Sequence, residues 1–133
     1  MTAKSPARMR ILVVDDEPTI CRALEIVLGR AGFEVVIAQS GEAAISAVRA
    51  EPFDCLIVDL RLTDLRGDVV FELAAAEQPH LRRQSLFITG DASARAMELI
   101  EACGVSSITK PFDLADLIAQ VTRLVRRARD ATA

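Results

Sequence analysis

The sequence is poor in the residue types that usually mark metal clusters, redox centres and nucleic-acid surfaces. Its 133 residues include no tryptophan or tyrosine, one histidine and three cysteines. Cys21, Cys55 and Cys103 lie far apart, and their spacing is not that of zinc ligands. We therefore interpret the cysteines as small hydrophobic residues that stay reduced inside the cell.

The chain also lacks a strong charge imbalance and a long hydrophobic run. Its net charge is −3, and no basic patch is interleaved with aromatic residues, so we expect no direct contact with nucleic acid. No apolar run approaches the roughly 20 residues that span a bilayer. The basic N-terminus has no signal-peptide core behind it. We therefore expect a cytoplasmic protein that does not contact a membrane.

What remains is a globular composition with a regular alternation of strand and helix patterns. Half of the residues (51%) are hydrophobic and 26% are charged, which is typical of a single folded domain. We expect a disordered lead-in over residues 1–8, one domain over residues 9–127 and a C-terminal tail over residues 128–133. Five strand patterns alternating with five helix patterns predict an α/β three-layer sandwich with right-handed crossovers.

Four of the predicted strands lead into side chains that can contact a phosphoryl group. The runs 11–14, 55–58, 86–88 and 105–109 lead, in that order, into Asp15 and Asp16, Asp59, Thr89, and Lys110. In an open parallel sheet, ligands bind just outside the carboxyl ends of the strands. The sequence therefore predicts that three carboxylates, a hydroxyl and an ammonium group converge in one crevice.

Such a group of side chains favours phosphoryl chemistry with a metal ion. Two carboxylates about 5 Å apart repel by about 3 kcal/mol at an effective dielectric constant of 20, so the acidic cluster favours binding a cation. An incomplete, all-oxygen ligand set suits Mg²⁺. Lys110 and Thr89 can stabilise charge on a phosphoryl group. Asp59, alone at the end of a central strand, is the candidate nucleophile.

Together these motifs resemble the receiver domain of response regulators, the CheY-like family of two-component signal transduction. The resemblance is carried by Asp15-Asp16, the stretch 59–67, Thr89-Gly90 and Lys110-Pro111-Phe112, and it covers residues 9–127. It implies a flavodoxin-like (βα)5 sheet with strand order 2-1-3-4-5. It also implies a phosphoprotein that signals through a conformational change and is not a turnover enzyme, apart from slow autodephosphorylation.

The resemblance also implies a role for each site residue. Asp59 would take the phosphoryl group from a histidine kinase or a phosphotransfer protein. Asp16, Asp59 and the backbone carbonyl of Arg61 would bind Mg²⁺ directly, and Asp15 would act mostly through water. Thr89 and Lys110 would complete the catalytic set by holding the phosphoryl oxygens, with the Lys110–Pro111 bond in the cis form.

One departure from the family pattern concerns output, and a second feature concerns phosphoryl lifetime. Ser107 stands three positions before the lysine, where receivers often carry an aromatic switch residue. Arg61 and Asp91 flank the site, and we expect them to pair across its mouth and hinder water. An exposed pair of this kind contributes little to stability.

Three alternatives stay open at this point. One is a phosphatase that turns over through an aspartyl phosphate, although its usual second acid is replaced here by Arg61. Another is a pseudo-receiver that only binds partners. The chain also fits either a stand-alone regulator or a receiver attached to an output domain or a hybrid kinase, acting on a downstream protein target, with a homodimer left open.

Overall fold

The computed structural model describes residues 8–132, with side chains described through residue 127. The lead-in predicted over residues 1–8 therefore lies outside the described residues, apart from Arg8. Residues 128–132, which we expected to form a tail, continue the last helix. Among the described residues, no helix has both the length and the apolar character needed to cross a membrane.

Strands and helices alternate along the whole described chain. The strands are β1 (Arg10–Val14), β2 (Glu34–Ala38), β3 (Cys55–Asp59), β4 (Ser85–Thr89) and β5 (Ser106–Thr109). The helices are α1 (Pro18–Arg30), α2 (Gly41–Ala50), α3 (Gly67–Glu77), α4 (Ala94–Cys103) and α5 (Leu114–Thr132), with a short 3₁₀ helix, η1 (Pro79–Arg82), before β4. The predicted fold is confirmed, and η1 is the element that the sequence pattern did not indicate.

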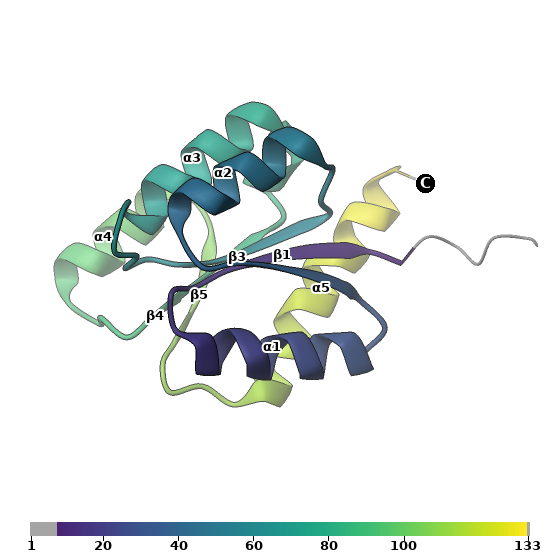
Figure 1. The fold of residues 1–133 in the computed structure, drawn as a ribbon, viewed down its shortest axis with the longest axis horizontal. Helices are drawn as coiled ribbons and strands as arrows, with labels where there is room; N and C mark the ends of the chain where they lie inside the picture. Colours follow the sequence, from purple (N-terminus) through teal and green to yellow (C-terminus); the bar gives the residue numbers. More distant parts are fainter. Residues whose placement is uncertain (1–7, 133) are drawn as a thin grey trace, which may run out of the picture.

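All five strands are parallel and lie in the order β2-β1-β3-β4-β5. Helices α1 and α5 cover one face of the sheet, and α2, α3 and α4 cover the other (Figure 1). The central strands β3 and β4 are buried along their whole length because both faces are covered, which explains their continuous apolar runs. The strand order predicted from the resemblance is confirmed.

The loop between β3 and α3 is tied to its surroundings by backbone contacts, and this fixes the end of β3. The N–H of Gly67 donates to the carbonyl of Leu60 at 2.8 Å. The carboxylate of Asp64 accepts the N–H groups of Gly41 and Glu42, both at 2.9 Å, at the start of α2. The loop that follows β3 is therefore anchored both to Leu60, next to the end of β3, and to the start of α2.

Candidate functional site

The predicted site residues come from the carboxyl ends of four strands. Asp15 follows β1, Asp59 and Thr89 are the last residues of β3 and β4, and Lys110 follows β5. The ammonium of Lys110 lies 2.9 Å from Oδ2 of Asp59 and 3.1 Å from Oδ2 of Asp15. Residues from both halves of the sequence thus meet in one crevice, because parallel strands end at the same edge of the sheet.

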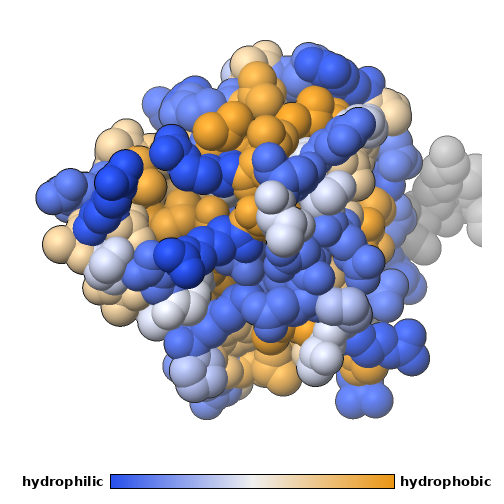
Figure 2. All heavy atoms as spheres, turned by 60° about the vertical axis from the view of Figure 1, so that its left-hand side comes forward, coloured by the Kyte–Doolittle hydropathy of each residue, from blue (hydrophilic) through white to orange (hydrophobic). Residues whose placement is uncertain are grey.

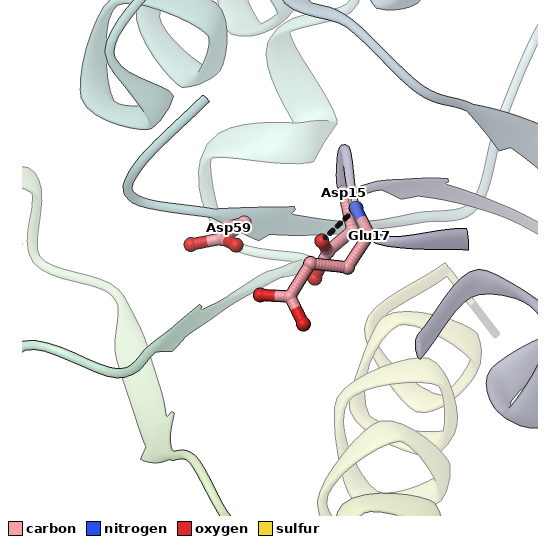
Figure 3. A group of neighbouring side chains, drawn as sticks. All are labelled: Asp15, Glu17 and Asp59. Carbon is pink, nitrogen blue, oxygen red and sulfur yellow. Dashed lines mark hydrogen bonds between the residues drawn. The ribbon is translucent and has the colours of Figure 1, made fainter. Parts of the chain in front are cut away.

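Glu17, rather than Asp16, completes the group of converging carboxylates. Oxygens of Asp15, Glu17 and Asp59 lie within 4.8 Å of one another, and Figure 3 shows these side chains at the ends of β1 and β3. Oε1 of Glu17 also accepts a hydrogen bond from Lys110 at 2.9 Å. Asp16 is half-buried in the loop before α1 and is not a member of this group.

The hydroxyl of Thr89 points to the loop that follows β4. Its Oγ1 accepts a hydrogen bond from the backbone N–H of Asp91 at 2.9 Å and donates to the carbonyl of Asp91 at 3.2 Å. Thr89 itself is fully buried. To donate a hydrogen bond to a ligand on Asp59, the hydroxyl would have to give up its bond to the carbonyl of Asp91. A ligand on Asp59 would therefore alter the contacts of this loop.

Arg61 contacts the site from the β3–α3 loop. Its backbone N–H donates to Oδ1 of Asp59 at 3.0 Å, which orients the carboxylate. Its guanidinium lies 3.5 Å from the carboxylate of Asp91, so the pair expected across the mouth is present. A hydrogen bond from the N–H of Ser93 and the charge of Arg61 both lower the pKa of Asp91.

Asp15 is a buried carboxylate with an incomplete set of partners. Its Oδ1 accepts the N–H of Glu17 at 2.9 Å. Its Oδ2 is buried and has no hydrogen-bond partner, although the ammonium of Lys110 is close enough to form an ion pair. Desolvation raises the pKa of Asp15, and the contacts with Glu17 and Lys110 offset this only in part.

Lys110 is held as a cation by its neighbours. Burial alone would lower the pKa of this lysine, but the hydrogen bonds to Asp59 and Glu17 and the ion pair with Asp15 outweigh burial and raise the pKa above its usual range. The bond between Lys110 and Pro111 is cis, as the resemblance implied. The site therefore offers a fixed positive charge beside Asp59.

The donor set fits a hard divalent cation. The three neighbouring groups are all carboxylates, and Oδ2 of Asp15 is a buried acceptor that lacks a hydrogen bond. Oxygen ligands of this kind bind Mg²⁺ or Ca²⁺ in preference to softer metals. The acidic cluster can therefore hold a metal ion.

Comparison with known proteins identifies the family. Residues 11–122 match the family model described as the response regulator receiver domain. The chain belongs to this family. The receiver is 31% identical over 118 residues to the transcriptional regulatory protein KdpE of Mycobacterium tuberculosis, covering 88% of the chain and 51% of KdpE. It spans about half the length of the first curated relatives that it matches.

Solved structures agree with this assignment. A CheY-like receiver domain from Methanospirillum hungatei JF-1 superposes with a TM-score of 0.87 at 25% identity, covering 94% of this chain and 99% of that one. A response regulator from Burkholderia pseudomallei, solved with a phosphorylated aspartic acid, a calcium ion and citrate, gives a TM-score of 0.77 at 25% identity. That match covers 94% of this receiver and 73% of the other chain.

The sequence prediction overlooked the contribution of Glu17. The segment Asp16-Glu17-Pro18 has the pattern of a helix start, and Glu17 is the residue before α1. The signal that could have revealed its second role is a third consecutive acid after a buried strand. With α1 starting at Pro18, the Glu17 side chain reaches Lys110, which lies 93 positions away in sequence.

Removing the charge of Asp15 should stabilise the metal-free receiver. A carboxyl group whose pKa is raised by folding makes the folded state less stable once the pH exceeds the unfolded pKa. We therefore expect Asp15→Asn to raise the thermal unfolding midpoint at neutral pH in EDTA. The gain should shrink as the pH falls, because the carboxyl becomes protonated in both states. A lower midpoint for the variant in EDTA at neutral pH would contradict the desolvation argument.

Proposed function

We propose that this receiver accepts a phosphoryl group on Asp59 in a Mg²⁺-dependent reaction with a phosphohistidine of a histidine kinase or phosphotransfer protein. The observation that carries the proposal is the position of the Asp59 carboxylate. It ends a buried central strand, bonds the ammonium of Lys110 at 2.9 Å and lies beside the carboxylates of Asp15 and Glu17. A nucleophile, a fixed cation and metal ligands thus share one crevice.

In this proposal an oxygen of Asp59 forms the new bond to phosphorus. The bond from phosphorus to the imidazole nitrogen breaks, and its electron pair stays on that nitrogen. Lys110 offsets the negative charge on the phosphoryl oxygens, and Thr89 donates its hydroxyl hydrogen to one of them. The N–H of Arg61 keeps the other carboxylate oxygen of Asp59 in place.

Mg²⁺ would be held by carboxylates of this site. Asp15, Asp16, Asp59 and the carbonyl of Arg61 are the ligands that the resemblance implies, and the proximity of Glu17 adds a further oxygen donor. When bound, the ion supplies Lewis-acid stabilisation of the phosphoryl oxygens. The calcium ion and phosphorylated aspartic acid named for the Burkholderia pseudomallei regulator support the same chemistry here.

We further propose that the receiver is a signalling acceptor rather than a turnover phosphatase. Two positions after Asp59 stands Arg61, which cannot act as a general acid or base at neutral pH. The intact set of Asp59, Thr89 and Lys110 argues against a pseudo-receiver.

The partners follow from the same proposal. We place the receiver in the cytoplasm, together with the phosphohistidine of its donor. Output would pass to a downstream protein or to an attached domain, since the chain matches about half of a transcriptional regulator. Attachment to a hybrid kinase and formation of a homodimer remain variants of this proposal.

The direct test is to locate the phosphoryl group. The receiver is incubated with acetyl phosphate in the presence of either Mg²⁺ or EDTA, and its intact mass is measured. Acyl phosphates are then labelled by reduction, and peptide mapping locates the labelled residue. We expect one Mg²⁺-dependent modification, on the peptide that contains Asp59. A modification at another residue, or none under either condition, would refute the proposal.

Arg61 should influence how long the phosphoryl group survives. If the pair between Arg61 and Asp91 hinders water at the mouth of the site, Arg61→Ala should shorten the phosphoryl lifetime. Because exposed ion pairs contribute at most about 1 kcal/mol, the change should be less than about tenfold. The measurement is the decay of phosphorylated protein after removal of acetyl phosphate. An unchanged decay rate would show that the pair does not screen the site.

A further inference from the structure

A cleft lies beside the proposed phosphorylation site, between the β3–α3 loop and the first half of α4. We call it the arginine cleft. It has a volume of about 460 Å³, and its apolar lining comes from Leu60, Leu62, Ala96 and Leu99. Leu60 and Ala96 are buried in the hydrophobic core and anchor the base of the cleft, so its accessible apolar surface comes mainly from Leu62 and Leu99. Figure 2 brings the α4 side of Figure 1 forward and shows hydrophobic surface bordered by strongly hydrophilic side chains.

Three arginines line the same cleft. Arg66 is paired with Asp68 through two hydrogen bonds, at 3.0 and 3.1 Å. Among the described residues, the guanidinium of Arg61 has an ion-pair contact only with Asp91, at 3.5 Å, and this side chain is 77% exposed. Arg95 is exposed at the start of α4 and takes part in no ion pair among the described residues.

The charge of the cleft is opposite to that of the whole chain. Its lining carries Arg61, Arg66 and Arg95 against the single acid Asp91. With Asp68, the partner of Arg66, included, the formal charge is +1 (three minus two), whereas the chain carries −3. Guanidinium groups prefer carboxylates, which they can bind with two parallel hydrogen bonds. A partner must therefore offer acidic groups to the rim and apolar groups to the floor.

We propose that the arginine cleft binds an acidic amphipathic helix of a protein partner. A helix with apolar side chains at positions i and i+4 can fill the floor, and flanking Asp or Glu residues can reach the arginines. A nucleic-acid strand fits less well, because the cleft has no aromatic side chain on which bases could stack. A small inorganic anion would leave the apolar floor uncovered.

The cleft and the proposed phosphorylation site share a loop. Asp91 lines the cleft, and its backbone N–H and carbonyl both bond the hydroxyl of Thr89. A helix on the cleft would thus contact the segment that must move when Thr89 turns towards Asp59. Binding itself does not depend on phosphorylation, and it is tested with the unmodified chain.

The test is a peptide selection followed by charge reversal. A random peptide library is selected against the unmodified receiver, and the affinity of the best binders is measured by calorimetry. We expect peptides rich in Asp and Glu with apolar residues at helical spacing. Arg95→Glu should weaken their binding by roughly tenfold or more, because like charges placed together across an interface cost several kcal/mol. Arg30→Glu, an exposed reversal at the end of α1, should leave the affinity nearly unchanged.

Three results would overturn the proposal. If the selected peptides are not enriched in Asp and Glu, the arginines at the rim do not determine which partner binds. If Arg95→Glu and Arg30→Glu lose equal affinity for the peptides, and both keep the circular dichroism spectrum of the original chain, the loss comes from the overall charge and not from the cleft. An oligonucleotide that displaces the peptides from the unmodified receiver, but does not bind Arg95→Glu, would make nucleic acid the occupant. Failure to phosphorylate Asp59 would affect none of these measurements, so the two proposals fail separately.

Discussion

Asp59→Asn should abolish phosphoryl uptake from acetyl phosphate in the presence of Mg²⁺. The amide keeps the shape of the carboxylate and can still contact Lys110, but its oxygen is a poor nucleophile and it carries no charge for a metal ion. The same change should remove the response to beryllofluoride, which mimics a phosphoryl group on the carboxylate. Intact mass spectrometry checks the first result, and the chemical shifts of the β4–α4 loop check the second.

A matched control separates loss of the acceptor from loss of an aspartate in general. Asp116 is exposed in the first turn of α5, so Asp116→Asn should take up phosphate like the original chain. Both variants should show the same circular dichroism spectrum. If Asp59→Asn still gains one phosphoryl group at the original rate, Asp59 is not the acceptor and the interpretation of the site fails.

Most of the fold could be predicted because the sequence pattern and the burial pattern agree. Runs such as 55–58 are apolar at every position, which fits a strand covered on both faces, and the structure buries all of β3. A serine before a helix pattern favours an N-cap, and the Oγ of Ser40 accepts the N–H of Ala43 at the start of α2. The helix η1 was missed because one short turn leaves no hydrophobic period in the sequence.

The convergence of Asp15, Asp59 and Lys110 was also predictable, since it follows from strand ends in a parallel sheet. The orientation of neighbouring side chains was not. Whether Asp16 or Glu17 turns towards Lys110 depends on the path of a short loop, and residue type does not fix that path. The pairing of Thr89 with Asp91 likewise arises from the loop after β4. The arginine cleft brings together residues from two loops and a helix, and no periodic pattern in the sequence indicates that they are neighbours.

Gly67→Ala should damage both stability and phosphoryl uptake, because this glycine packs directly against the backbone that carries Asp59. An added Cβ would overlap the carbonyl oxygen of Asp59 and lie only 2.7 Å from Cα of Leu60. These atoms belong to the backbone at the end of β3, so no side chain can rotate away to relieve the contact. Either α3 or the end of β3 must shift.

Overpacking of this kind typically costs about 1–3 kcal/mol, and the shift would also misplace the Asp59 carboxylate relative to Lys110. Gly29 provides the matched control, since a Cβ there meets nothing within 4 Å. Inside α1, Gly29→Ala should stabilise the receiver by roughly 0.5–1 kcal/mol and leave phosphorylation unchanged. Urea unfolding and the rate of uptake from acetyl phosphate measure both effects. Opposite signs of stability change at the two glycines would show that close contact with β3, and not glycine itself, sets the geometry of the site. A Gly67→Ala variant with unchanged stability and rate would mean that the end of β3 tolerates displacement.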